Sequence, residues 1–370
     1  MAAASGPPGR TVVVKVGTSS ITDERGHIVE AAIAKLCSEV AQLRADGQQV
    51  IIVTSGAIAA GLRVLDLHPR PSDPAVLQAV SAVGQSRLMG HYERALERVG
   101  LVGGQVLLAP LDFVNRAQYL HARQTLWLLL GLGVVPVVNE NDAVADDEIR
   151  FGDNDRLAAL VAHLVQAELL VLLTDAAGLF TADPRLDETA SLVEEVAEVD
   201  QVLALAGGAG SQRGSGGMAS KLAAAKMAAW SGVRVVIASA ERPNVLQDAV
   251  SGTPGVGTVV KPRMARLPAR KLWIAFALAP SGTVVVDAGA KKALMEKGVS
   301  LLPAGVREVR GDFLPDEAVE LAGPDGVVFA KGLVRHSAKA LSEWMGWKTS
   351  LLPPDVPTEV VHRDDLVMLP

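Results

Sequence analysis

Short apolar runs alternate with longer amphipathic segments through the first 260 residues of the chain. Several runs are apolar at every position, whereas a strand with one exposed face would alternate between apolar and polar residues. Continuous apolar strands are typical of a parallel sheet that is covered on both faces. The runs predict strands at Thr11–Val16, Val50–Val53, Gln105–Ala109, Val134–Val138, Leu169–Leu173 and Val233–Ala238.

Helical periodicity fills the intervals between these strands. The predicted helices are Glu30–Ala45, Ala75–Val99, Arg116–Leu130, Asp155–Gln166 and Met218–Ser231. Repeated strand–helix–strand units with right-handed crossovers predict an α/β fold, a three-layer αβα sandwich around a mainly parallel sheet. Ligands of such folds bind at the carboxyl ends of the strands, so residues that directly follow strands should carry the chemistry.

The pattern changes after Pro254–Arg270, a stretch that is rich in glycine, proline and basic residues. Beyond it, short strand-like runs separated by Gly and Pro turns predict a small, mostly β barrel or sandwich. We therefore expect a first domain over residues 10–260, a linker over 261–280 and a second domain over 281–366. The predicted strands of the second domain are Ser281–Val286, Val306–Val309, Ala318–Leu321 and Val327–Lys331.

Composition limits the classes of protein to which this chain can belong. Its 370 residues are 49% hydrophobic and 21% charged, which supplies buried cores and excludes intrinsic disorder. Aromatic residues make up only 4% and the net charge is −6, so neither base stacking nor a broad basic surface favours nucleic-acid binding. An anionic ligand would have to be held by a few local cations and backbone N–H groups.

The single cysteine and the length of the apolar runs indicate the setting of the protein. Cys37 cannot form an intramolecular disulfide or a zinc site built from several cysteines, and we expect a buried structural thiol on a helix. Residues 1–10 lack the apolar segment of a signal peptide. No uncharged apolar run reaches the ~20 residues that a membrane span needs. We expect a soluble, cytoplasmic protein.

Small, polar and basic residues follow the first two predicted strands directly. Lys15-Val-Gly17-Thr-Ser combines a lysine with a flexible glycine and hydroxyl groups, which suits an anion. Thr54-Ser55-Gly56 leads from a strand straight into small residues that can begin a helix, whose N-terminal N–H groups also bind anions. Each pattern is equally consistent with an ordinary tight turn, so neither is decisive alone.

Carboxylates and amides gather after the fourth predicted strand. Asn139-Glu-Asn-Asp142 follows this strand at once, and Gly152-Asp-Asn-Asp155 comes shortly afterwards. Such side chains could hold an ammonium group, orient lysines or contact the water shell of a metal ion. The second group also suits a turn with a helix N-cap. We expect Asp153 to be mainly structural, and Asn154 and Asp155 to be functional.

Two further segments have the features of a nucleotide site. Thr174-Asp175 begins a long, turn-rich excursion after the fifth predicted strand, which could cover a nucleotide. The glycine-rich segment Gly214–Lys221 opens a helix, so its backbone N–H groups and its lysine could cradle a phosphate. This segment matches neither the Walker A loop nor the dinucleotide-binding glycine pattern. Alone it would be read as a flexible loop with a solvated lysine.

In their order along the chain, these motifs resemble those of the glutamate 5-kinase family in the amino acid kinase superfamily. They are Lys15-Val-Gly-Thr-Ser, Thr54-Ser-Gly-Ala-Ile-Ala-Ala-Gly61, Asn139-Glu-Asn-Asp-Ala-Val144, Gly152-Asp-Asn-Asp155, Leu173-Thr-Asp175 with Gly178-Leu-Phe-Thr-Ala-Asp-Pro-Arg185, and Gly216-Gly-Met-Ala-Ser-Lys221. Three later segments resemble a PUA domain: Val286-Asp-Ala-Gly-Ala290, Ser300-Leu-Leu-Pro-Ala-Gly305 and Gly332-Leu-Val-Arg335. The chain departs from the family pattern at Ser215 and Ala219, where Thr and Ser are common.

The resemblance implies an amino acid kinase fold followed by a mostly β PUA barrel. It implies transfer of the γ-phosphoryl group of ATP to the side-chain carboxylate of L-glutamate, the first step of proline biosynthesis, with Mg²⁺ as the metal ion. Catalytic roles are implied for Lys15, Lys221 and Asp155, and contacts with L-glutamate for Ser55, Asp142 and Asn154. The implied contacts with ATP are Lys15, Thr174, Asp175, Ser215, Gly216, Gly217, Met218, Ala219, Ser220 and Lys221.

The resemblance also suggests partners. Proline is expected as a feedback inhibitor, glutamyl-phosphate reductase as the recipient of a labile product, and a homo-oligomer as the assembly. Two alternatives stay open. One is another enzyme of the superfamily, such as acetylglutamate kinase or aspartokinase, and the other is a protein that binds RNA through its PUA domain. Residues Ser281–Pro370 contain ten Lys and Arg against thirteen Asp and Glu, a net charge of −3, so RNA binding is not expected.

Overall fold

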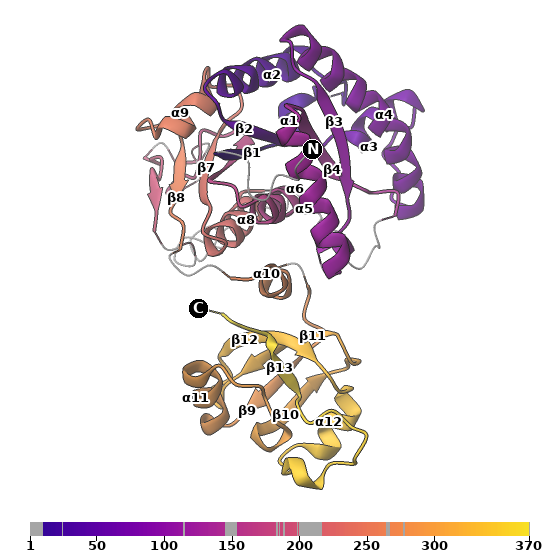
Figure 1. Cartoon of the computed structure of the whole chain (residues 1–370), viewed down its shortest axis with the longest axis vertical. Helices are drawn as coiled ribbons and strands as arrows, with labels where there is room; N and C mark the ends of the chain where they lie inside the picture. Colours follow the sequence, from indigo (N-terminus) through magenta and orange to yellow (C-terminus); the bar gives the residue numbers. More distant parts are fainter. Residues whose placement is uncertain are drawn as a thin grey trace. The chain divides into compact units, whose positions relative to one another are not determined.

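The chain forms two units in a computed structural model, Met1–Arg266 and Leu267–Pro370 (Figure 1). The residues that the structure describes are 10–23, 25–113, 115–144, 154–182, 184, 186–187, 189–197, 199, 217–263, 267–276 and 278–369.

An eight-stranded sheet runs through the first unit in the order β3-β4-β2-β1-β5-β7-β8-β6. Its strands are β1 (Thr11–Val16), β2 (Gln49–Val53), β3 (Gly103–Leu108), β4 (Val135–Glu140), β5 (Leu169–Thr174), β6 (Glu195–Val196), β7 (Arg234–Ser239) and β8 (Thr258–Val260). All neighbouring strands pair in parallel except β7 and β8, which are antiparallel. The mainly parallel sheet is therefore confirmed, and each of the six predicted strands matches an observed one to within two residues at either end.

Helices cover both faces of this sheet, which confirms the three-layer architecture. One layer contains α2 (Glu30–Ala45), α4 (Pro74–Arg98) and α9 (Val245–Ser251), and α2 contacts the other two. The opposite layer contains α5 (Arg116–Gly131), α6 (Asn154–Val165) and α8 (Met218–Trp230), with α6 between the others. In Figure 1 α2 lies above the strands, and α5, α6 and α8 lie below them. The short elements α1 (Thr18–Ile21) and η1 (Pro110–Phe113) follow β1 and β3.

Burial explains why the central strands read as continuous apolar runs. Every residue of β1, β4 and β5 is buried, because helices cover both faces of the sheet. Val12, Val14 and Val16 of β1 face the layer of α2, α4 and α9, with which they form one core cluster. Lys15 is the charged exception within β1, and only 2% of its surface is exposed.

Two glycines bring α3 (Ala57–Val64) and α4 into close contact. A Cβ atom on Gly84 would lie 1.8 Å from the carbonyl oxygen of Ala57, and one on Gly61 would lie 2.0 Å from that of Val80. Only glycine fits at either position. The start of α3, which follows the Ser55-Gly56 turn, is therefore fixed against the middle of α4.

Cys37 lies on α2 and is fully buried in the core, as expected for a structural thiol. Burial disfavours the thiolate and raises the pKa of Cys37 to about 12. The thiol therefore stays protonated near neutral pH and is a poor nucleophile.

The second unit contains a five-stranded sheet in the order β10-β9-β11-β12-β13. Its strands are β9 (Gly282–Val286), β10 (Val306–Gly311), β11 (Ala318–Ala322), β12 (Val328–Val334) and β13 (Val361–Met368). The pairs are antiparallel except for β9 and β11. Among the described residues no pairing of β10 with β13 closes the sheet, so the expected barrel is corrected to an open sheet. Helices α11 (Ala288–Lys297) and α12 (Ala338–Trp344) and the turns η2 (Pro303–Gly305) and η3 (Thr349–Leu351) complete this unit.

A helix lies within the range that composition suggested as a linker. This helix, α10 (Ala269–Phe276), belongs to the second unit and packs against β12 and β13. Leu272 and Ile274 are fully buried, and the Arg270 guanidinium lies 2.5 Å from a carboxylate oxygen of Asp365 on β13. The buried Lys331 of β12 donates to the carbonyl oxygen of Leu278 just after the helix. The contacts of α10 thus place it in the unit that spans Leu267–Pro370.

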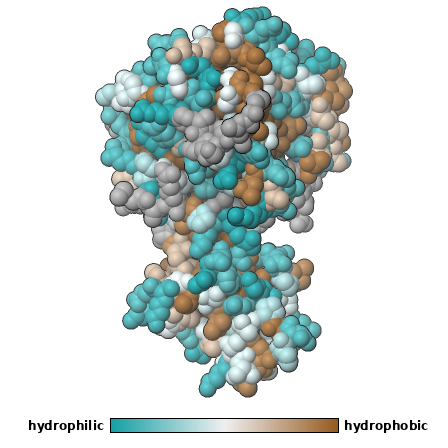
Figure 2. Space-filling view, in the orientation of Figure 1, coloured by the Kyte–Doolittle hydropathy of each residue, from teal (hydrophilic) through white to brown (hydrophobic). Residues whose placement is uncertain are grey.

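Figure 2 shows how hydrophilic and hydrophobic residues are distributed over one face of the molecule. Hydrophilic residues cover much of the face shown in Figure 2, with hydrophobic residues interspersed among them. Scattered exposed apolar side chains of this kind are normal. Within the described ranges, no helix is both long enough and apolar enough to cross a membrane.

Candidate active site

Parallel pairing gathers the chemically distinctive motifs at one edge of the first sheet. Strands β4, β2, β1 and β5 are consecutive in the sheet and point in the same direction. Asn139 and Thr174 lie at the carboxyl ends of β4 and β5, and Thr54 and Gly17 directly follow β2 and β1, so these four residues share one edge. A site at this edge agrees with the rule for open α/β sheets.

A buried carboxylate joins two lysines from different elements. One oxygen of Asp155 lies 2.6 Å from Nζ of Lys15, and its other oxygen lies 3.2 Å from Nζ of Lys221. Asp155 is in the first turn of α6, Lys15 in β1 and Lys221 in the first turn of α8. The three side chains are 0%, 2% and 9% exposed, so their attraction acts in a poorly solvated setting. The sequence separates these residues widely, and the fold brings all three catalytic candidates together.

The Lys15 ammonium group lies over the turn that follows its own strand. A Cβ atom on Gly17 would be 3.6 Å from Nζ of Lys15. The cation and the backbone of Gly17 are therefore close enough to act on the same anion. This arrangement supports the reading of Lys15-Val-Gly17 as an anion site rather than as a turn with a solvated lysine.

Amide side chains form a second buried group beside the lysines. The Asn154 amide nitrogen donates to the backbone carbonyl of Thr54 and, at 2.7 Å, to Oδ1 of Asn139. The Asn139 amide nitrogen donates in turn to Oε1 of Gln85, also at 2.7 Å. All four residues are at least nine-tenths buried. This set is called the amide chain below.

Helix α4 contributes three polar side chains to this edge of the sheet. Gln85 closes the amide chain, and Ser81, one turn earlier, donates to Oδ2 of Asp142 over 2.6 Å. The hydroxyl of Tyr92 lies 2.8 Å from Oγ1 of Thr54, and burial raises the pKa of this phenol well above its usual range. We therefore expect Tyr92 to remain neutral and to act only as a hydrogen-bonding group.

Sequence reasoning predicted α4 as a helix and missed these three residues. It also quoted Asn139 as part of a motif without giving it a role. The available signal was the placement of Ser81, Gln85 and Tyr92 on one stripe of a helix that otherwise buries apolar residues there, such as Leu88. Spacing alone could not identify their partners, which lie on distant strands.

The nucleotide candidates lie at the ends of β5 and α8. Oγ1 of Thr174 donates to the carboxylate of Asp175 over 2.9 Å, and Asp175 is exposed. Helix α8 begins after Gly217 with no side-chain cap among the described residues. The N–H groups at the start of a helix can bind an anion. Met218, Ala219 and Ser220 form this first turn. Ser215 and Gly216 lie outside the described residues, as does Asp153.

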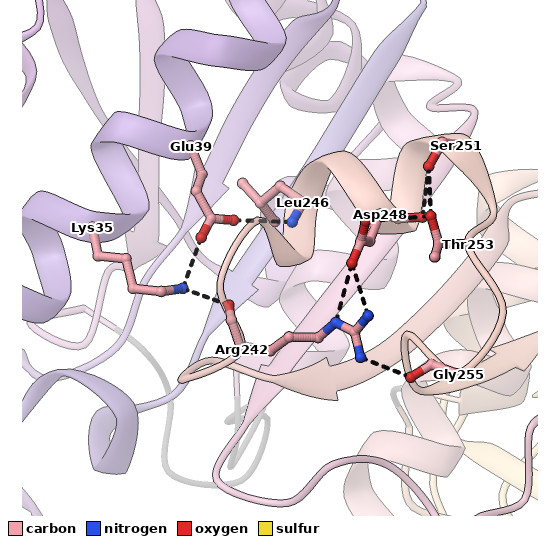
Figure 3. A network of polar contacts seen from close by, with 8 residues as sticks. All are labelled: Lys35, Glu39, Arg242, Leu246, Asp248, Ser251, Thr253 and Gly255. Carbon is pink, nitrogen blue, oxygen red and sulfur yellow. Dashed lines mark hydrogen bonds and ion pairs between the residues drawn. The ribbon is translucent and has the colours of Figure 1, made fainter.

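A polar network holds the turn after β7, and Figure 3 shows its contacts at Lys35, Glu39 and Arg242. Nζ of Lys35 on α2 lies 2.8 Å from Glu39 and donates to the carbonyls of Ala240 and Arg242 over 2.9 Å each. The N–H of Ala240 donates to the carbonyl of Thr174 over 2.8 Å. Through these contacts, Lys35 on α2 helps to hold the end of β5, where the nucleotide candidates Thr174 and Asp175 lie.

The same network continues into α9. Glu39 accepts from the backbone N–H of Leu246 over 3.0 Å, and Arg242 forms two hydrogen bonds with Asp248. The backbone between β7 and α9 is therefore held at both of its ends.

The remaining substrate candidates are less tightly held. Ser55 is half-buried and directly follows Thr54, whose backbone carbonyl belongs to the amide chain. Asp142 is also half-buried and accepts a hydrogen bond from Ser81. Over the described ranges no three His, Cys, Asp or Glu side chains gather as a protein metal site.

Two family models match this chain. The amino acid kinase family model matches residues 10–239, and the PUA domain model matches residues 282–350. The first covers the sheet without β8 and both helix layers without α9, and the second covers four strands of the second unit.

Full-length relatives are similar along nearly the entire chain. A protein of Burkholderia multivorans named glutamate 5-kinase is 46% identical over 97% of this chain and 98% of its own length. Proteins of the same name from Trichlorobacter lovleyi and Herpetosiphon aurantiacus are 46% and 45% identical, and each alignment covers at least 96% of both chains.

The Asp155 carboxylate should be essential for the stability of this buried site. We expect Asp155→Asn to lower the free energy of unfolding by about 3–5 kcal/mol, because it leaves two buried ammonium groups without their shared counter-charge. Urea unfolding followed by circular dichroism measures the loss. The matched control is Glu195→Gln, which breaks an exposed ion pair with Lys261 and should cost less than about 1 kcal/mol. Equal losses in the two variants would contradict the role of Asp155.

Proposed function

The chain belongs to the glutamate 5-kinase family, and on this premise we propose that it phosphorylates the side-chain carboxylate of L-glutamate with ATP. The product is L-glutamyl 5-phosphate, and the reaction is the first step of proline biosynthesis. The observation that carries the proposal is the buried carboxylate of Asp155 with Lys15 and Lys221 on its two oxygens.

The chemistry of the acceptor determines what such a site must supply. A glutamate side chain has a pKa of ~4.3, so it is already ionised near neutral pH and needs no general base. The difficulty is that an anionic nucleophile must approach an anionic phosphoryl group in line. Positioning and cationic groups must therefore provide most of the catalysis, as in other phosphoryl transfers.

The two lysines match this requirement. Lys15 lies over the Gly17 turn, and we assign it to the phosphate oxygens near the transferring group. Lys221 is in the first turn of α8, and we assign it to the β,γ region, where negative charge accumulates on the leaving group. Asp155 orients both ammonium groups before substrates bind. A preorganised pair of this kind reduces the rearrangement that the protein must make during the reaction.

We assign ATP to the ends of β5 and α8. Thr174, Asp175 and the segment from Ser215 through Gly216, Gly217, Met218, Ala219 and Ser220 to Lys221 would contact it. Mg²⁺ would neutralise phosphate charge and align the phosphate oxygens, bound mainly by ATP and water.

We assign L-glutamate to the acceptor side of the same edge. Asp142 has the charge that suits the α-ammonium group, while Ser55 and Asn154 offer a hydroxyl and an amide. This side of the site is adjacent to Lys15 through the shared strand edge, which would bring the two substrates together.

Partners beyond the substrates are expectations from the family. Proline is expected to inhibit, glutamyl-phosphate reductase to receive the labile acyl phosphate, and the protein to form a homo-oligomer in the cytoplasm. The second unit is expected to serve stability, assembly or regulation rather than RNA binding.

One assay tests the main proposal. Purified protein is incubated with ATP, Mg²⁺, hydroxylamine and either L-glutamate, N-acetyl-L-glutamate or L-aspartate, and hydroxamate formation is measured. We expect hydroxamate from L-glutamate alone, and less of it when proline is added. Hydroxamate only from N-acetyl-L-glutamate or L-aspartate would assign the chain to another reaction of the superfamily, and none from folded protein would reject the proposal.

Lys221→Ala should abolish most of the turnover while the protein stays folded. We expect kcat to fall at least about 100-fold, because the charge that develops on the leaving group loses a nearby cation. The control is Lys261→Ala, which removes an exposed lysine outside the site and should leave kcat within about twofold. A fall below about tenfold, or ~1.4 kcal/mol of barrier, would remove Lys221 from the catalytic role.

Asp142→Ala should affect L-glutamate far more than ATP. We expect the KM for L-glutamate to rise at least about tenfold, because the ammonium group loses its carboxylate partner, and the KM for ATP to stay within about twofold. Asp46→Ala, at the exposed end of α2, is the control with neither effect. Similar increases in both KM values would place Asp142 outside the glutamate site.

A further inference from the structure

The hydrogen bonds of the amide chain have a fixed direction. The backbone carbonyl of Thr54 can only accept, so the part of the Asn154 side chain that faces it must be the NH₂ group. This assignment does not depend on telling the nitrogen and oxygen of the amide apart by shape. The carbonyl of Thr54 thus sets the orientation of Asn154 at one end of the amide chain.

The same direction continues through Asn139 to Gln85. The second hydrogen of the Asn154 NH₂ group goes to Oδ1 of Asn139, over 2.7 Å. Asn139 therefore turns its own NH₂ group toward Gln85, which must accept through Oε1. An acceptor on Gln85 is thus needed for Asn139 to keep the orientation that Asn154 requires.

This direction leaves Asn154 with one group for a ligand. Both hydrogens of its side-chain NH₂ group are used within the amide chain. Its side chain can therefore offer a ligand only the carbonyl oxygen, which accepts hydrogen bonds. An acceptor matches an ammonium group and is poorly matched to a carboxylate. Asp142 is also an acceptor, and its rotamer is held by the Ser81 hydroxyl.

We infer that Gln85 is a positioning residue that, through Asn139, keeps the Asn154 carbonyl oxygen directed at the α-ammonium group of L-glutamate. The inference rests on the proposed function and adds a specificity to it. Ser81 acts in parallel on Asp142. Helix α4 would thereby select substrates with a free, protonated α-amino group without touching them.

The packing of α4 suits this task. Gly84, next to Gln85, meets the start of α3 so closely that no side chain would fit between the two helices. Tyr92, on the same stripe of α4, holds the side chain of Thr54, whose carbonyl begins the amide chain. Both ends of the amide chain are therefore tied to one helix.

The NH₂ group of Gln85 makes no contribution that would explain the choice of an amide at this position. Its Nε2 atom is buried and has no hydrogen-bond partner among the described residues. A buried donor without an acceptor is unfavourable, and an apolar side chain of similar size would avoid it. The amide is therefore more readily explained by its oxygen, which Asn139 uses.

The test compares Gln85→Leu, which removes the acceptor, with Gln85→Glu, which keeps one. A buried Glu retains an acceptor oxygen for Asn139 whether or not it is protonated, and it loses no hydrogen bond that the described part of the chain makes through Nε2. The control is Met89→Ala, one turn further along α4, which creates a cavity in the core without touching the amide chain.

For Gln85→Leu we expect the KM for L-glutamate to rise at least about tenfold while the KM for ATP stays within about twofold. Gln85→Glu should recover most of this loss. Met89→Ala should lower the melting temperature and leave both KM values unchanged. Glutarate, which lacks the ammonium group, is added as a competitive inhibitor, and its Ki should be the same in the Gln85→Leu variant and the unsubstituted protein.

Three results would overturn the inference. They are an unchanged KM for L-glutamate in Gln85→Leu, no recovery in Gln85→Glu, and a rise in the Ki of glutarate that parallels the KM of L-glutamate. Failure of the proposed function is distinguishable from all three, because the unsubstituted protein would then give no glutamyl hydroxamate.

Discussion

The buried interaction of Asp155 with Lys15 and Lys221 is the constraint on which the rest of the first unit depends. Moving an ammonium group out of water is costly unless a carboxylate meets it with good geometry. One carboxylate meets two such groups here, so β1, α6 and α8 must converge at one point. The central position of β1 in the sheet, with α6 packed against it and against α8, provides that convergence.

The start of α6 also joins the two halves of the site. Asn154 and Asp155 are adjacent, and neighbouring residues of a helix point about 100° apart. One therefore enters the amide chain while the other reaches the lysines. Under the proposed function, a single helical turn would thus fix acceptors for an ammonium group beside cations for phosphates. A shift of α6 would then disturb the proposed sites of both substrates together.

Local patterns were sufficient to predict the elements but not the contacts between them. The bounds of β1 and α2 follow from an unbroken apolar run and a clear helical period, and the motif residues were found because they directly follow strands. Ser81 and Gln85 could not be found in this way, since their partners lie 61 and 54 residues further along the chain. Helix α10 was missed because Pro268 and the basic residues before it outweighed eight amphipathic positions. Strand β13 was missed because its partners, β12 and the bridge residue Leu301, lie well apart from it in the sequence.

Burial explains why the lysines lie on one side of the candidate site, and Asp142 and the amide chain on the other. Cations and anionic acceptors that share one poorly solvated edge would neutralise one another if their side chains could move freely. Here Asp155 holds the lysines on one side, and α4 holds Asp142 and the amide chain on the other. Neutral amides are well suited to the boundary, because they give direction to hydrogen bonds without adding charge that the lysines would attract. Under the proposed function, the close contact between α3 and α4 at Gly61 and Gly84 would therefore serve the chemistry as well as the packing.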